Sequence, residues 1–319
     1  MLYDFFERNM IEPSVILKFR KNYDEVLKLL KPKEDFPVLS SQEKNFLTFL
    51  SSFFTPAKRV HEMIILKEIL EKDFVTSCNI EKILEEKYQL KNQETNIENS
   101  FKHLAKEIFT SLSTMKEFEP IILKNGNGYE ISKEFKASYR DKNYFKNLID
   151  DLIKYNLAYA EKNYKQTGEE TILKYKEYTK QEAFWNLNLD FNNGYQVSGY
   201  TVFEEEGKVI VFITLDDSSS FTSYDNKFLD ERKFIWFSKT NRYLSRKGID
   251  TIEGKIKKNI YVMEIFVKKE LGENFYYFGE VEKVLEAEEI VNSDKKPLVK
   301  YELLLKNEIK KELFDYMIK

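Results

Sequence analysis

The sequence predicts an α+β protein in which an all-helical N-terminal domain is followed by a mixed, β-barrel-like C-terminal domain. Glycine distribution is the first observation: none of the 10 glycines precedes Gly126, and the early chain is rich in the helix formers Leu, Ile, Lys and Glu. The second is a change of apolar periodicity from helical to strand-like near Ile172. A length of 319 residues is enough for two hydrophobic cores. We expect domains over 1–165 and 172–319, joined by the polar segment 166–171.

Helical spacing of apolar residues defines the elements of the first half. A helix is predicted over Ser14–Leu30, because Pro13 stands just ahead of it and Pro32 stops it. Ser40 and Glu43 have the spacing of a capping box, which marks the start of the next helix. The same periodicity predicts helices over 60–71, 79–87, 97–112 and 144–156, and the glycines of Lys124–Tyr129 predict a turn.

Strand-like runs separated by turn residues fill the second half. The segment 208–215 is apolar at both odd and even positions, which is typical of a central strand covered on both faces. A short helix over 307–318 closes the chain. The predicted strands are Lys208–Leu215, Lys233–Ser238, Ile260–Lys268, Phe275–Val281 and Leu298–Leu305.

Composition excludes several classes of protein. No run of about 18 apolar residues exists, so we expect no membrane association. The first residues lack a signal-peptide pattern and Cys78 is the only cysteine, which fits a reducing cytoplasm. His61 and His103 are the only histidines, and their helical settings predict surface or half-buried positions. We therefore expect neither a histidine-based metal site nor a cofactor.

The strongest electrostatic feature follows the predicted strand at 233–238. Between Arg232 and Lys258 the chain has nine lysines and arginines against two acids, although its overall net charge is −3. Cations interleaved with hydroxyls and amides suit phosphate contacts. Tyr224 and Tyr243, which have polar neighbours, could stack on bases. Trp236 is instead predicted to be a core residue. In a chain that is 33% charged, such runs are also ordinary solvated surface. The predicted DNA-binding residues are Lys239, Thr240, Asn241, Arg242, Tyr243, Ser245, Arg246, Lys247, Lys255, Lys257, Lys258 and Tyr224.

Several longer patterns in this half resemble one family. They are YKEYTKQEAFWNLNLD (175–190), GYTVFEEEGKVIVFITLDDS (199–218), SYDNKFLDERKFIWFSKTNR (223–242) and FYYFGEVE (275–282), followed by LVKYELLLKNEI. Together they resemble the uncharacterised C-terminal domain of bacterial DEAD/DEAH-type superfamily-two helicases. Many of these helicases carry a phospholipase-D-like nuclease and belong to restriction or phage-defence systems. The helical half, including LYDFFERNMIEPSVILKFRKNY, is similar to the region that precedes that domain.

The motor and that nuclease are both missing from this chain. It has no G-x-x-x-x-G-K-[ST] phosphate loop, and neither histidine is followed by a lysine two residues later. The resemblance therefore implies a helicase-associated role without catalysis and supplies no catalytic residues. We expect a DNA-binding accessory module, reading duplex DNA and in particular modified or foreign DNA, with a separate helicase or nuclease chain as a second partner.

Two alternatives stay open. Asp217, Glu231 and Lys233 have the order of a D…E-x-K metal-dependent nuclease, in which two carboxylates hold a divalent ion and the lysine supports the attacking water. In such enzymes the E-x-K triplet lies inside a strand, whereas here it precedes one. The other alternative is an adaptor whose acidic helical half docks a helicase or nuclease.

Overall fold

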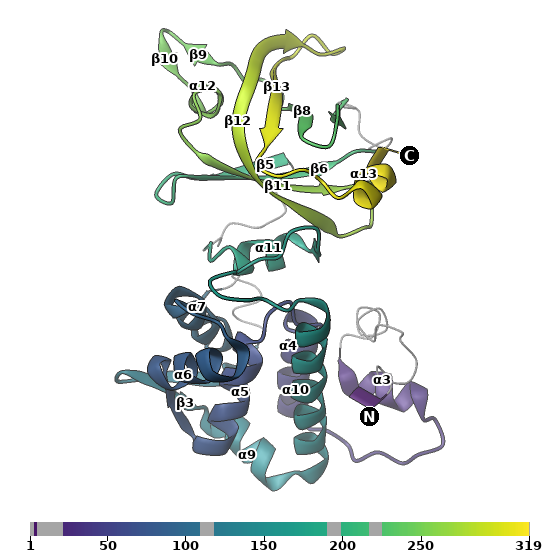
Figure 1. Ribbon diagram of the computed structural model, residues 1–319. Helices are drawn as coiled ribbons and strands as arrows, with labels where there is room; N and C mark the ends of the chain where they lie inside the picture. The colour runs from purple at the N-terminus through teal and green to yellow at the C-terminus, as the bar shows by residue number, and fades with distance from the viewer. Residues whose placement is uncertain (1–2, 5–21, 109–117, 190–198, 217–224, 319) are drawn as a thin grey trace. The chain divides into compact units, whose positions relative to one another are not determined.

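The computed structural model describes residues 3–4, 22–108, 118–189, 199–216 and 225–318. Two compact units are present (Figure 1). The first comprises residues 1–172 and 184–194, and the second comprises 173–183 and 195–319. The described residues 184–189 thus belong to the helical unit, although they lie beyond the linker expected from the sequence. The predicted domain limits, 1–165 and 172–319, stay a prediction.

Helices make up most of the first unit. Ser40 accepts a hydrogen bond from the Glu43 amide while the Glu43 carboxylate accepts one from the Ser40 amide, which confirms the predicted capping box. The predicted helix over 14–30 is described only from residue 22, and it ends at Leu30 as expected. The helices are α3 (Tyr23–Leu30), α4 (Ser41–Phe53), α5 (His61–Lys72), α6 (Ser77–Tyr88), α7 (Glu94–Leu104), α9 (Lys133–Asp141) and α10 (Asn143–Asn163).

A small sheet also belongs to the first unit, so the expectation of an all-helical domain is wrong. Strands β1 (Phe74–Thr76), β2 (Ile122–Asn125) and β3 (Gly128–Ile131) pair antiparallel in the order β1-β3-β2. Strands of three or four residues are too short to show a two-residue alternation, and only the turn at Gly126 was visible in the sequence. A Cβ atom at Gly128 would lie 2.5 Å from the Val75 carbonyl oxygen, so this pairing requires glycine.

Both histidines are buried, which corrects the expectation of surface or half-buried positions. His61 is 0% and His103 2% exposed, and both lie in a polar cluster inside the first unit. His61 Nε2 lies 3.0 Å from Gln93 Oε1, and His103 Nδ1 lies 3.0 Å from Glu62 Oε1. Helical spacing could not show this, because the buried partners come from other helices.

The second unit is built around one long, mixed sheet. Its order is β5-β6-β11-β12-β13-β8-β7, with β4 paired to β12, and β6 and β11 run parallel. Because β5 and β7 end the path, the sheet does not close within the described residues, and the structure is mixed α/β rather than a closed barrel. The elements are β4 (Glu177–Tyr178), β5 (Gly199–Phe203), β6 (Lys208–Thr214), β7 (Lys227–Phe228), β8 (Lys233–Phe237), β11 (Val262–Lys268), β12 (Phe275–Val291), β13 (Pro297–Leu305) and α13 (Lys311–Ile318). Helix α11 (Lys180–Asn186) begins in this unit, and its last three residues belong to the first.

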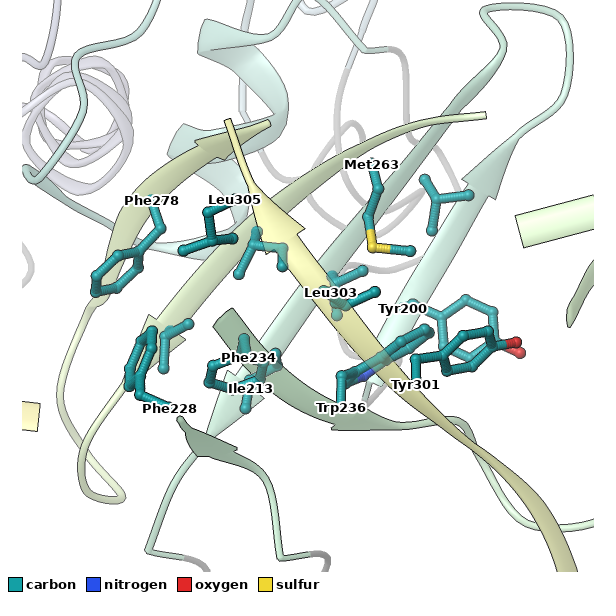
Figure 2. Packing of buried hydrophobic residues seen from close by; sticks show 14 of the residues in the cluster. Tyr200, Ile213, Phe228, Phe234, Trp236, Met263, Phe278, Tyr301, Leu303 and Leu305 are labelled. Carbon is teal, nitrogen blue, oxygen red and sulfur yellow. The ribbon is translucent and has the colours of Figure 1, made fainter. Parts of the chain in front are cut away.

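Strand β12 carries the sheet around the core. Its first part, residues 276–280, pairs with β11, and its second part, residues 281–291, pairs with β13. Gly279, with φ of +92°, lies at the change of partner. The enclosed side chains come from strands on both sides of the bend (Figure 2). Trp236 is 2% exposed, which confirms its prediction as a core residue.

None of the described helices combines the length and the apolar composition that crossing a lipid bilayer requires.

Candidate nucleic-acid interface

The predicted DNA-binding residues lie mainly on a short hairpin and a helix that follow β8. We call this segment, residues 239–258, the basic lobe. It contains β9 (Ser245–Arg246), β10 (Ile249–Asp250) and α12 (Ile252–Lys257). Lys247 and Gly248 connect the two strands, and both have positive φ, at 51° and 78°. Two consecutive positive φ values are the requirement of a tight two-residue hairpin turn, and they bring Arg246 opposite Ile249.

Hydrogen bonds donated by backbone amides hold the first residues of the lobe to the sheet. The buried Ser238 Oγ accepts a hydrogen bond of 2.9 Å from the Val299 amide. Three residues later the Asn241 amide, in a left-handed conformation, donates to the Pro297 carbonyl at 2.7 Å. The Leu244 amide then donates to the Glu289 carboxylate at 2.7 Å. These contacts fix where the chain leaves the core.

Helix α12 packs closely against the segment that leads into the hairpin, with Gly254 next to the Leu244 carbonyl. Thr251 caps the helix, its hydroxyl accepting from the Gly254 amide at 3.3 Å and donating to the Tyr243 carbonyl. A Cβ atom at Gly254 would lie 2.1 Å from the Leu244 carbonyl oxygen, closer than any side chain can approach. Glycine at this position therefore allows the hairpin and the helix to form one rigid piece.

A buried polar network anchors the lobe from below. The buried Glu253 carboxylate accepts a hydrogen bond from the Tyr200 hydroxyl and faces Arg242 Nε at 3.4 Å. The Tyr301 hydroxyl donates to the Glu253 carbonyl at 3.1 Å. Trp236 stacks on Tyr301 with ring centroids 4.9 Å apart, at the end of the core where both tyrosine hydroxyls lie (Figure 2). Burial, and then the Glu253 carboxylate, raise the pKa of the Tyr200 hydroxyl.

Lys239 is part of this anchor rather than of the outer surface. Its ammonium group donates to the Tyr200 carbonyl at 3.2 Å and lies 5.0 Å from the centroid of the Tyr200 ring. Burial and the nearby Arg242 guanidinium lower the pKa of Lys239. A half-buried ammonium group with these contacts is less available to a phosphate than a fully solvated one.

Apart from Lys239, the other eight cations of the sequence cluster divide into three groups. Arg232 and Lys233 lie at the far end of β8, beside Glu282 and Glu302. Within the lobe, carboxylates face three further cations: Arg242 pairs with Glu253, Lys255 with Glu204 and Lys258 with Asp250. The exposed residues Arg246, Lys247 and Lys257 have no carboxylate within 4.0 Å in the described part of the chain. Arg246 instead lies 4.7 Å from the Tyr243 ring centroid.

The remaining predicted DNA-binding residues are uncharged. Thr240 is half-buried, and Asn241 and Ser245 are exposed at the lobe. Tyr224, the other stacking candidate, lies outside the described residues, as does Asp217 of the alternative nuclease site. The sequence pattern did not reveal Tyr200 or the anchoring role of Glu253, which was counted only as an opposing charge. Thr251, a favoured N-cap residue, was the available signal for the start of the helix that buries Glu253.

The other two nuclease residues lie where a turn leads into β8. Asp230 Oδ1 accepts hydrogen bonds from the Arg232 and Lys233 amides at 2.8 and 2.7 Å, so Glu231 lies on a capped turn and Lys233 is the first residue of the strand. Glu231 is exposed, and the Lys233 ammonium group lies 3.6 Å from Glu302. No group of three or more His, Cys, Asp or Glu side chains gathers in a metal-binding arrangement among the residues that the structure describes.

The family comparisons cover both units. Residues 1–166 match the family described as domain of unknown function DUF8090, and this match spans more than half of the chain. The chain therefore belongs to that family. Residues 172–317 match a second family, domain of unknown function DUF3427. No curated protein matches the chain.

Solved structures give a weaker likeness. The SRA domain of SUVH5 in complex with hemimethylated CG DNA is 14% identical, with a TM-score of 0.32, and the match covers 44% of this chain and 92% of that one. SUVH6 of Arabidopsis thaliana in complex with SAM is 13% identical, with a TM-score of 0.30, covering 44% of this chain and 27% of that one. The SUVH5 SRA domain bound to fully hydroxymethylated CG DNA is 13% identical, with a TM-score of 0.30, covering 42% and 89%. Similarity at this level assigns neither a ligand nor a site to this chain.

Proposed function

We propose that the second unit binds duplex DNA through the basic lobe and does so without catalysis. The supporting observation is the set Arg246, Lys247 and Lys257, which are exposed, lack carboxylate partners among the described residues and sit on a hairpin and helix locked together at Gly254. Cations held at fixed separations suit the regular phosphate spacing of a duplex. Paired lobe cations such as Lys258 and Arg242 would contribute less, because a carboxylate already faces them.

The finer parts of the proposal rest on the resemblance to restriction and defence helicases. On that basis the chain serves as the recognition module of a helicase–nuclease system and reads foreign or modified DNA. A helicase or nuclease chain, docked by the first unit, would supply the motor and the cleavage. Capture of such a chain by the first unit, with binding insensitive to added DNA, would instead favour the adaptor role.

The decisive experiment reverses two unpaired charges. The double variant Arg246→Glu, Lys247→Glu is expected to weaken binding to a 20-base-pair duplex by about tenfold or more and to reduce the slope of log affinity against log salt by about two. Arg242 is left unchanged, because a glutamate there would face the buried Glu253 carboxylate and disturb the fold. Fluorescence anisotropy at two salt concentrations, with unmodified and methylated duplexes, measures both quantities.

A matched control carries the same change of charge elsewhere on the second unit. Lys310 and Lys311 are exposed at the start of α13, and the variant Lys310→Glu, Lys311→Glu should leave duplex affinity within about twofold of the wild type. Equal losses in both double variants, or no binding by the wild type at low salt, would remove the basic lobe as the interface.

A further inference from the structure

The first unit has a groove that the proposed DNA interface does not use. Its volume is about 610 Å³, within the range of small-ligand sites. Residues of α5, α6, α9 and α10 line it, together with Tyr3. Apolar side chains contribute part of its surface, namely Leu70, Ile153, Leu157 and Ala158.

Three tyrosines line the groove, and a lysine lies near each ring. The Lys154 ammonium group lies 4.0 Å from the centroid of the Tyr3 ring, Lys87 lies 5.1 Å from that of Tyr88, and Lys146 lies 5.3 Å from that of Tyr139. Lys67 adds a fourth cation, and all four lysines are exposed. The groove thus combines flat aromatic surfaces with solvated positive charge.

Three carboxylates line the groove, and two of them, Asp150 and Glu161, accept hydrogen bonds from tyrosines; the third is Glu71. The Tyr139 hydroxyl donates to Asp150 at 2.6 Å. Burial, and then the Glu161 carboxylate, which is hydrogen-bonded to the Tyr88 hydroxyl, raise the pKa of Tyr88. Within the described residues, Lys67, Lys87, Lys146 and Lys154 have no carboxylate within 4.0 Å. Their charge is therefore available to a ligand.

We propose that this groove binds a nucleotide, with its base against the tyrosine rings and apolar surface and its phosphate on the lysines. A purely apolar ligand would make no use of four ammonium groups that have no carboxylate within 4.0 Å among the described residues, although three carboxylates also line the groove, and a simple anion would leave the aromatic surface unused. A planar ring joined to a phosphate uses both, and stacking of a base on an aromatic side chain contributes about 1–3 kcal/mol. Either a free nucleoside phosphate or the end of a single strand supplies this chemistry.

The test measures binding of adenosine monophosphate to the full-length chain by isothermal titration calorimetry. The double variant Lys87→Gln, Lys146→Gln is expected to bind it at least tenfold more weakly, and adenosine, which lacks the phosphate, should bind the wild type at least tenfold more weakly. The control variant Lys82→Gln, Lys133→Gln removes two exposed lysines outside the groove lining and should bind like the wild type. Circular dichroism of each variant verifies its folding.

A second arm identifies the source of the nucleotide and separates this proposal from the DNA interface. A 5′-phosphorylated oligothymidine 12-mer is titrated into the Arg246→Glu, Lys247→Glu background, in which the basic lobe is disabled. Tighter binding of the 12-mer than of the mononucleotide supports a strand end, and the reverse supports a free nucleoside phosphate. Three outcomes would overturn the proposal: neither probe binds, the groove and control variants bind equally, or inorganic phosphate competes as well as the mononucleotide.

Discussion

Each unit contains a buried glutamate paired with an arginine, and the two pairs differ in how much of the arginine reaches solvent. In the first unit, Arg59 and Glu62 are 4% and 6% exposed at their side chains, and Arg59 Nε lies 3.1 Å from both carboxylate oxygens. In the second unit, Glu253 is 4% exposed but Arg242 is 47% exposed, and one contact of 3.4 Å joins them.

The surroundings explain the difference. The Arg59 guanidinium also donates to Ser100 and to the Trp185 carbonyl, and His103, stacked on the Trp185 ring at 4.2 Å, contacts Glu62. Burial opposes ionisation of Glu62, but Arg59 and His103 outweigh it and hold the pKa of Glu62 well below its usual value. The first pair is thus an internal part of the fold. The second anchors a surface and leaves about half of the Arg242 side chain exposed to water.

Removing the buried Glu62 carboxylate should have the largest effect on stability. Glu62→Ala leaves the Arg59 guanidinium buried without its counter-charge, and the free energy of unfolding should fall by about 3–5 kcal/mol. Urea denaturation followed by tryptophan fluorescence measures this, because Trp185 lies beside the pair. Glu68→Ala, which breaks the Lys72 pair on the surface of the same helix, is the control and should change stability by about 0.5 kcal/mol or less. Similar losses in the two variants would contradict the comparison.

A pH dependence should accompany the inner cluster. Burial, and then the Arg59 charge, lower the pKa of His61 to about 4, from 6.5. Between these values the unfolded chain binds a proton that the folded chain does not, so stability falls as the pH drops from 6.5 to 4, by about 3 kcal/mol at the lower end. His61→Gln should show a shallower loss over that range in thermal unfolding. Parallel curves for variant and wild type would show that His61 does not carry the effect.

Breaking the Arg242–Glu253 pair should change stability the least. Arg242→Ala leaves Glu253 with its hydrogen bond from Tyr200, so we expect a loss of about 1 kcal/mol, since the arginine is half exposed. Arg246→Ala, on the same lobe but without a carboxylate partner in the described residues, should stay within about 0.5 kcal/mol. Denaturant midpoints distinguish the two. A larger loss for Arg246 would mean that the hairpin tip stabilises the fold.

The sequence predicted elements whose signals are local. Ser40 and Glu43 lie three residues apart and form the capping box at the start of their helix, and the continuous apolar run within 208–214 marks a strand covered on both faces. The end of β12 was predicted at Val281 but lies at Val291, because residues 282–289 are rich in glutamate and owe their extended form to pairing with β13. The hairpin at Lys247–Gly248 has two-residue strands, too short for any periodicity.

The location of the DNA-binding site stays a prediction, and the sequence did not show how the charges at that location are organised. Lysines and arginines at 239–258 do gather on one lobe, but only contacts remote in sequence decide which of them are neutralised. Glu204 reaches Lys255 across 51 positions, and Tyr200 reaches Glu253 across 53. The burial of His61 and His103 arises in the same way, because helix packing supplies their partners. A charge count along the chain contains no information about such pairings.

The contact between Gly254 and the Leu244 carbonyl has a consequence for recognition. Because no side chain fits there, the distance between the charges of the hairpin and those of α12 is set before any ligand arrives. Binding then loses little conformational freedom of the backbone, which favours a stiff, evenly charged partner and disfavours one that must itself be reshaped. Gly254→Ala would separate the two elements while leaving every charge in the sequence in place, and would show how far spacing rather than charge selects the ligand.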